Sequence, residues 1–280
     1  MATISSALRR FYFRFKDKRW WHNHIYPSNL DVEILQNKKI RMTYLARFVD
    51  FQDVAVLSNQ FLGARSHLIL SGPSVNDIVE PARLTRDFCF TVNGSPALFE
   101  RHGLKYDAYV VDDPRFVKKR GADVVKFAAA AKYCFLSYRS IFYLLRQGFD
   151  LSALNIYVFD YHFMPFRKPY DEDPYPFFAS SLTSRIGLCD SVAYIVLQLA
   201  HGMGFKQAVL FGMDLSMSGR FYAEKKSHPQ FLDRNWQAGI VEPMTLLSTM
   251  IKTGKLENWK TGKLENWKTG KLENWKTGRC

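Results

Sequence analysis

The feature that most restricts the fold of this chain is a series of short apolar segments. Segments of four or five mostly apolar residues lie at 67–70, 88–92, 108–111, 133–136, 156–159 and 208–211. Such runs, without polar alternation, are typical of strands that are buried on both faces, as in parallel sheets. Amphipathic stretches separate them, and residues 190–203 have the acidic start and the terminal glycines of a helix. The sequence therefore predicts an α/β fold with a doubly wound, mostly parallel, Rossmann-like sheet.

Four of these segments are followed by turns that carry glycine, hydroxyl, amide or carboxyl groups. The turns are Ser71-Gly72-Pro73-Ser74, Asn93-Gly94-Ser95, Asp112-Asp113-Pro114 and Gly212-Met213-Asp214. Ligands of doubly wound sheets bind beyond the carboxyl ends of the strands, and free N–H groups beside glycine can hold a phosphate. We therefore expect a nucleotide site at these turns. Each turn taken singly also fits an ordinary connection in which Asn or Asp caps a helix.

Other catalytic and cofactor signatures are not found in the sequence. It has no Walker loop, no GxGxxG, no GxSxG and no HExxH, which disfavours NAD and the corresponding hydrolases. The four cysteines are scattered, which disfavours disulfides and a structural zinc site. We expect neither a metal nor a cofactor. His228 follows the last predicted strand in a polar loop and is a candidate general base, an ordinary surface histidine being the alternative.

The positive charge is concentrated at the two ends of the chain. Of the net charge of +13, residues 1–20 carry +5 and residues 252–279 carry another +5, which leaves about +3 for the remainder. Basic ends on a nearly neutral body fit an anionic membrane surface better than a nucleic-acid groove. Aromatic and basic residues alternate within 8–21, as in segments that lie in a lipid interface. An ordinary basic surface helix is the alternative for that segment.

Composition divides the chain into three parts, namely a basic-aromatic segment (1–60), a nucleotide-binding domain (61–251) and a repeat tail (252–280). The tail repeats Lys-Leu-Glu-Asn-Trp-Lys-Thr-Gly at 255–262, 263–270 and 271–278. A period of eight fits neither the heptad of a coiled coil nor known solenoid lengths, and a recurring glycine weakens a helix. We therefore expect a flexible tail. Because the chain has no signal peptide and no apolar run of about 20 residues, a cytoplasmic location is expected.

The turns and their order resemble those of a known family. The matching pieces span about 67–224 and comprise the residues 68–74 (LILSGPS), 92–95 (VNGS), 113–116 (DPRF), 186–189 (IGLC), 212–215 (GMDL) and 220–224 (RFYAE). They are similar to those of the bacterial lipopolysaccharide-core Kdo transferases and, more distantly, of the small bacterial CMP-sialic-acid sialyltransferases. Ser71 and Asp113 depart from the pattern, since the sialyltransferases have asparagine at both positions.

The resemblance implies a glycosyltransferase of the GT-A-like sialyltransferase type. It would move Kdo from CMP-Kdo to a lipopolysaccharide or lipooligosaccharide core acceptor, at the inner face of the inner membrane, without a nucleic-acid partner. Transfer of sialic acid from CMP-sialic acid is one alternative, and a non-catalytic, membrane-associated nucleotide-binding protein is another.

The resemblance also implies a set of donor-binding residues. They are Gly72, Pro73, Ser74, Asn93, Gly94, Ser95, Asp113, Arg115, Arg185, Gly212, Asp214 and Tyr222. Asp214 would accept from the ribose hydroxyls, and Tyr222 would donate to the CMP phosphate. Arg115 and Arg185 would hold anionic groups. The family's catalytic histidine lies nearer the C-terminus than His228 does.

Overall fold

A computed structural model describes residues 30–35, 39–159, 161–162, 178–179, 181–183, 186–187, 191–213 and 260–261. The basic-aromatic residues 1–29 and most of the repeat tail lie outside these ranges. So do four of the predicted site residues, namely Arg185, Asp214, Tyr222 and His228.

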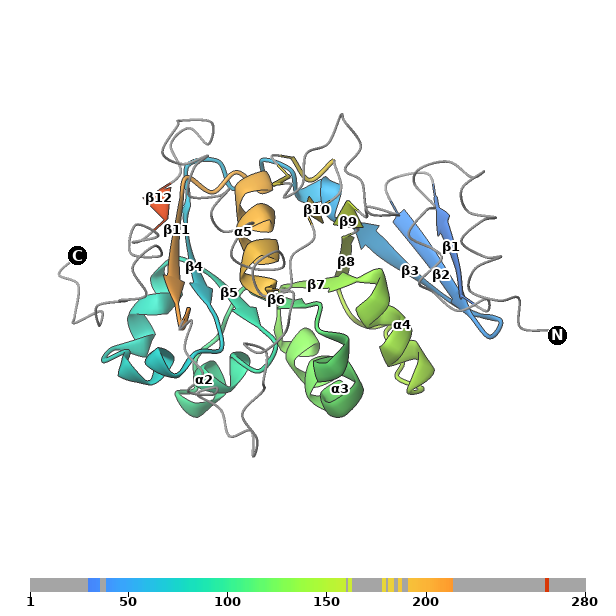
Figure 1. Ribbon diagram of the computed structural model, residues 1–280, viewed down its shortest axis with the longest axis horizontal. Coiled ribbons are helices and arrows are strands. Elements are labelled where there is room, and N and C mark those ends of the chain that lie inside the picture. Colours follow the sequence, from blue (N-terminus) through green and yellow to red (C-terminus); the bar gives the residue numbers. More distant parts are fainter. Residues whose placement is uncertain are drawn as a thin grey trace, which may run out of the picture.

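A ten-stranded sheet forms the centre of the fold, in the order β1-β2-β3-β8-β7-β6-β5-β4-β11-β12 (Figure 1). The strands are β1 (Leu30–Ile34), β2 (Lys39–Tyr44), β3 (Arg47–Asp53), β4 (Arg65–Ile69), β5 (Phe88–Val92), β6 (Ala108–Val111), β7 (Tyr133–Ser137), β8 (Ile156–Phe159), β11 (Gln207–Phe211) and β12 (Lys260–Thr261). All neighbours from β3 to β12 pair in parallel, whereas β1-β2 and β2-β3 pair antiparallel. The prediction of an α/β fold with a mostly parallel sheet is confirmed.

Two apolar cores cover the two faces of the sheet. Ile69, Tyr109 and Leu136 belong to the core beneath α2 (Pro96–Arg101), α3 (Pro114–Ala130) and α4 (Tyr138–Arg146). Their neighbours Leu68, Val110 and Phe135 belong to the other core, beneath α5 (Val192–Gly202). Because successive side chains of a strand point to opposite faces, a strand that is covered on both faces must be apolar throughout. This explains the short apolar runs of the sequence.

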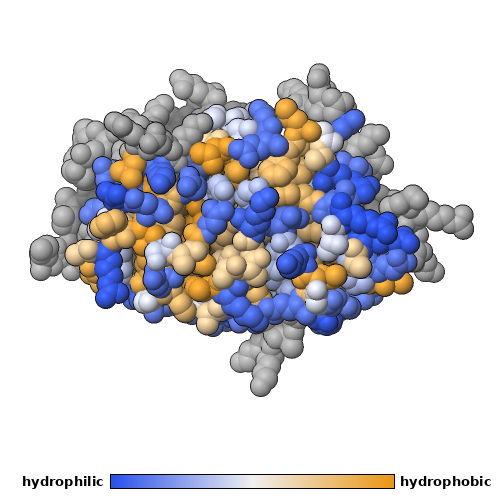
Figure 2. All heavy atoms as spheres, turned by 180° about the vertical axis from the view of Figure 1, so that it is seen from behind, coloured by the Kyte–Doolittle hydropathy of each residue, from blue (hydrophilic) through white to orange (hydrophobic). Residues whose placement is uncertain are grey.

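The strands β1 to β3 form an antiparallel meander at one end of the sheet, shown in blue in Figure 1. β3 pairs with β8, so the sheet continues across the predicted boundary at residues 60 and 61. Leu45 is exposed in the turn between β2 and β3, and Phe48 is exposed in β3. Two other connections expose Leu62 and Val79. Figure 2 shows hydrophilic and hydrophobic residues interspersed on the face opposite to that of Figure 1. None of the helices described is long and apolar enough to cross a membrane.

The order of the strands reverses once along the sheet. The chain proceeds from β4 through β5, β6 and β7 to β8, and then returns through α5 to β11, on the other side of β4. The connections after β4 and before β11 therefore lead to opposite sides of the sheet. In open α/β sheets this reversal opens a crevice at the carboxyl ends of the two strands, here those of β4 and β11.

Two residues of the repeat tail belong to the sheet. Lys260 and Thr261, in the first repeat, form β12 and pair in parallel with Gln207 and Ala208 of β11. The physical reason is that β11 would otherwise present unpaired backbone groups on this side, and an added strand supplies their partners.

Candidate functional site at the carboxyl edge of the sheet

The four predicted turns lie along one edge of the sheet. Three of them follow the adjacent parallel strands β4, β5 and β6, and the fourth follows β11 on the other side of β4. Since parallel strands all end at the same edge, the turns form one continuous row. The structure therefore brings together the described members of the predicted donor site, which are Gly72, Pro73, Ser74, Asn93, Gly94, Ser95, Asp113, Arg115 and Gly212.

The β4 and β11 turns remain in contact beyond the ends of their strands. The Gly72 N–H donates to the Gly212 carbonyl over 2.8 Å, and Gly72 precedes a short 3₁₀-helix, η4 (Pro73–Asp77). Gly212 has a φ of +71°, a conformation that favours glycine. A β-carbon at Gly212 would lie 2.4 Å from the Val75 Cγ2 atom. Glycine is therefore needed at position 212 for both its backbone conformation and the close approach of Val75.

The β5 turn holds Asn93 in a defined and uncommon conformation. Asn93 is only 6% exposed and has a φ of +48°, which asparagine tolerates better than most residues. Its carbonyl accepts from the Tyr109 hydroxyl over 2.8 Å. Ser95 Oγ accepts from the Val92 N–H and donates to the Ile69 carbonyl, so Ser95 uses its hydroxyl inside the fold. Of these predicted residues, Asn93 presents its side chain to the site and Ser95 fixes the turn.

The β6 turn begins helix α3. The Asp113 carboxylate accepts from the Arg115 N–H over 2.8 Å, and Pro114 is the first helical residue. Asp113 therefore caps the helix, as the alternative interpretation of the turn expected. The Arg115 side chain is exposed at the same end of α3.

Several side chains at this edge hold a buried polar atom that has no hydrogen-bond partner within the part of the chain that the structure describes, and three of them bear on a ligand site. They are Ser71 Oγ after β4, Asn93 Oδ1 after β5 and Arg139 Nε just after β7. A buried polar group without a partner costs about 1–3 kcal/mol, and natural proteins rarely retain one without a reason. A polar ligand that lies across the strand ends would supply the missing partners. Ser58 Oγ, in the connection between β3 and β4, is a further buried atom of this kind, so it is the combination with the row of turns that makes the carboxyl edge the candidate site.

Arg139 is the member of this group that the sequence analysis missed. Tyr138 and Ser140 flank it at the start of α4, and in the sequence such residues look like those of an ordinary helix. A usable signal was nevertheless present, because Ser137 ends the apolar segment of β7 just as Ser71 and Asn93 follow β4 and β5. The turn after β7 therefore meets the same criterion as the other four turns, namely a polar residue at the end of a short apolar strand.

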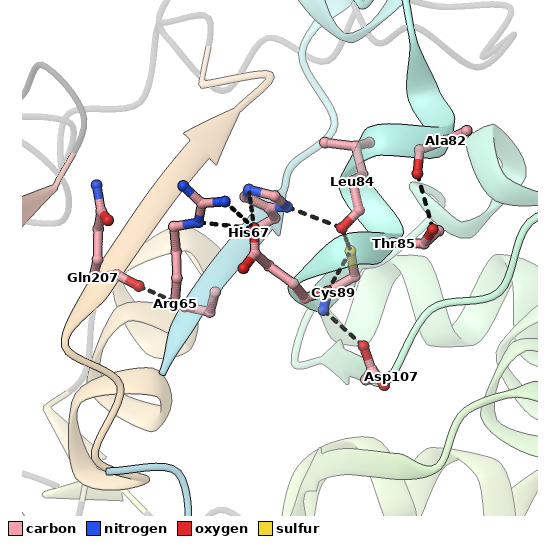
Figure 3. Close-up of polar contacts among 10 residues, drawn as sticks. Arg65, His67, Ala82, Leu84, Thr85, Cys89, Asp107 and Gln207 are labelled. Carbon is pink, nitrogen blue, oxygen red and sulfur yellow. Dashed lines mark hydrogen bonds and ion pairs between the residues drawn. The ribbon is translucent and has the colours of Figure 1, made fainter. Parts of the chain in front are cut away.

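In contrast, polar side chains near the amino-terminal ends of β4 and β5 are paired with neighbouring groups (Figure 3). Arg65 Nε donates to Asp87 Oδ2 over 2.8 Å, and His67 Nε2 lies 3.4 Å from the same oxygen. His67 Nδ1 and Cys89 Sγ both contact the Leu84 carbonyl, at 3.0 and 2.8 Å. These contacts fasten the 3₁₀-helix η5 (Pro81–Arg86) to β4 and β5. The cluster is therefore structural.

Burial shifts the pKa values of both titratable groups that contact Leu84 toward their neutral forms. Removal from water lowers the pKa of His67, although the Leu84 carbonyl and Asp87 oppose the shift. Burial likewise raises the pKa of the Cys89 thiol well above its ordinary range, so this thiol stays protonated and unreactive. Within the described ranges, no group of three or more His, Cys, Asp or Glu side chains is placed to hold a metal ion.

Comparison with known proteins adds no family to this description. No protein-family model matches the sequence, and no curated protein matches it at a meaningful level. The placement of the site therefore depends on the fold and on the partnerless buried atoms. The activity is a proposal from the sequence resemblance and from the chemistry of the edge.

Proposed function

We propose that the protein is a glycosyltransferase that uses a CMP-activated sugar, with Kdo as the sugar and a lipopolysaccharide or lipooligosaccharide core as the acceptor. The observation that carries the proposal is the coincidence of two independent features at one edge. Two of the turns that resemble the family, after β4 and β11, flank the strand-order reversal, and Ser71, Asn93 and Arg139 along the same edge hold buried polar atoms without a hydrogen-bond partner among the described residues. We further propose the GT-A-like sialyltransferase type for the fold and an anionic membrane surface as the place of action.

The proposed reaction is a displacement at the anomeric carbon of the sugar. An acceptor hydroxyl oxygen forms a bond to that carbon, the bond from that carbon to the CMP phosphate oxygen breaks, and CMP leaves with the electron pair. The hydroxyl proton passes to a base, for which we propose His228. The anomeric carbon of Kdo also bears a carboxylate, so the transition state combines oxocarbenium character with nearby negative charge. The protein's main contribution is then to fix the phosphate and the carboxylate in place.

The described residues offer groups suited to such a donor. The Asn93 amide and the Ser71 hydroxyl can hydrogen-bond to a base or a ribose. Gly72 lacks a side chain beside the crevice between β4 and β11, so a nucleotide can approach the β4 turn there, whereas the space beside Gly212 is filled by Val75. For Asp214, Tyr222 and Arg185, the roles proposed are those that the resemblance implies.

A thermal-shift comparison of CMP with UMP, GMP and NAD tests the nucleotide preference. A ligand that binds only the folded protein adds about 2.7 kcal/mol at a concentration of 100 times Kd. For a chain of 280 residues, this corresponds to a rise in Tm of roughly 5–10 °C. We expect this rise with CMP and a much smaller one with UMP, GMP or NAD. Equal shifts with all four nucleotides, or no shift with CMP, would contradict the proposal.

A further inference from the structure

Arg139 is half-buried at the start of α4, and one donor of its guanidinium lacks a partner among the described residues. Its Nε atom is buried and has no hydrogen-bond partner, and its guanidinium forms no ion pair with any residue of the described ranges. The planar guanidinium of arginine carries five N–H donors, so a buried Nε without a partner leaves a donor for a bound anion. Retaining it costs stability in the ligand-free protein.

The position of Arg139 relates it to the rest of the edge. The register pairs Val111 of β6 with Leu136 of β7, so Asp112 and Ser137 are neighbours at the ends of these strands. Asn93 follows β5, on the other side of β6. Neighbouring strands lie about 4.8 Å apart, so the ends of β5 and β7 are about 10 Å apart. A long side chain from the start of α4 and a ligand at Asn93 can therefore meet above the end of β6.

The carboxylates nearest in the fold do not neutralise Arg139. Asp113 uses an oxygen to cap α3, as described above. Asp112 is buried at the end of β6, and no described ion pair joins it to Arg139. Arg139 thus has no ion-pair partner among the described residues.

We infer that Arg139 binds an oxyanion of the sugar-nucleotide donor, either the CMP phosphate or the carboxylate of the sugar. The inference rests on the proposed function and adds to it a residue outside the set that the sequence resemblance implied. The planar guanidinium suits both groups, because it can donate two parallel hydrogen bonds to a phosphate or a carboxylate. Arg139 thereby becomes a specificity residue for an anionic donor, while Ser71 and Asn93 contact the neutral parts of the nucleotide.

Calorimetry on wild type and Arg139→Gln tests this assignment with three ligands, namely cytidine, CMP and CMP-Kdo. Glutamine keeps a polar side chain but removes the charge. We expect the variant to bind CMP or CMP-Kdo at least 10-fold more weakly, as for the loss of a charged hydrogen bond, and to bind cytidine as wild type does. We expect its ligand-free Tm to be unchanged or higher, because a partnerless charge has been removed. A merely structural arginine would lower Tm on substitution.

Arg146→Gln is the matched control, since Arg146 is exposed in the last turn of the same helix. It should change none of the three affinities. Weaker binding of both CMP and CMP-Kdo by Arg139→Gln assigns Arg139 to the phosphate, and weaker binding of CMP-Kdo alone assigns it to the carboxylate. Equal affinity of wild type and variant for all ligands overturns the inference and leaves the proposed function standing. If wild type binds none of the three ligands, both proposals fall.

Discussion

Replacement of Gln198 by leucine is expected to lower the free energy of unfolding by about 3–5 kcal/mol. Gln198 is fully buried in α5, and its Oε1 atom accepts from the N–H groups of Ala179 and Gly187 over 2.8 and 2.7 Å. Its Nε2 atom donates to the Gly187 carbonyl over 3.0 Å. Leucine would leave these three backbone groups buried without partners, at about 1–3 kcal/mol each. Urea denaturation of both proteins measures the difference.

Gln60→Leu is a suitable control for this experiment. Gln60 is exposed, and its side chain contacts only the Val56 carbonyl among the described residues. Such surface substitutions usually change stability by less than about 0.5 kcal/mol. A loss below about 1 kcal/mol for Gln198→Leu would show that Gln198 does not anchor the segments at Ala179 and Gly187 to α5.

Gly212→Ala is expected to cost about 2–5 kcal/mol of stability and to abolish CMP binding. The left-handed backbone of Gly212 accounts for about 1–2 kcal/mol, because an alanine β-carbon is disfavoured there. The contact with Val75 adds about 1–3 kcal/mol, because the new carbon cannot fit without displacing its neighbours. Any such displacement moves the β4 and β11 turns apart at the proposed nucleotide crevice. Urea denaturation and CMP calorimetry together measure the two effects.

Gly103→Ala separates the two causes. Gly103 also has a positive φ, +63°, but a β-carbon added there would meet no atom within 4 Å. It should therefore show only the backbone penalty, about 1–2 kcal/mol, and should bind CMP normally. Equal stability losses in the two variants, with CMP binding intact in both, would mean that the crowding at Gly212 has no consequence for the site.

The parallel strands could be predicted from the sequence because burial on both faces leaves an unmistakable pattern. β5, β6 and β8 begin and end at the predicted residues, and β4, β7 and β11 differ by one or two. The meander of β1 to β3 was not predicted. Its first two strands, Leu30–Ile34 and Lys39–Tyr44, alternate apolar with polar residues, which is the pattern of a half-buried strand, so a usable signal was present.

The edge of the site could also be predicted, since every parallel strand ends there. The side chains that face a ligand at this edge could not be predicted from the sequence. Ser95 and Asp113 belong to the predicted residue types, yet their oxygens bind groups of their own turns. Whether the hydrogen bonds of a polar atom are already used within the fold depends on its tertiary neighbours. For the Ser95 hydroxyl, one partner is the carbonyl of Ile69, which belongs to another strand. The sequence signal at Ser137 pointed to the turn after β7, but the role of Arg139 in it depended on the buried Nε atom that the structure shows.

The most direct test of the account is transfer itself. The protein is incubated with a core oligosaccharide acceptor and either CMP-Kdo or CMP-sialic acid, and the mass of the acceptor is recorded. We predict an increase by one Kdo residue with CMP-Kdo, with release of CMP, and no increase with CMP-sialic acid. An increase with CMP-sialic acid alone would identify the sugar as sialic acid and contradict the assignment of Kdo. An acceptor of unchanged mass with both donors, from a protein that binds CMP, would contradict the claim that the chain is a transferase.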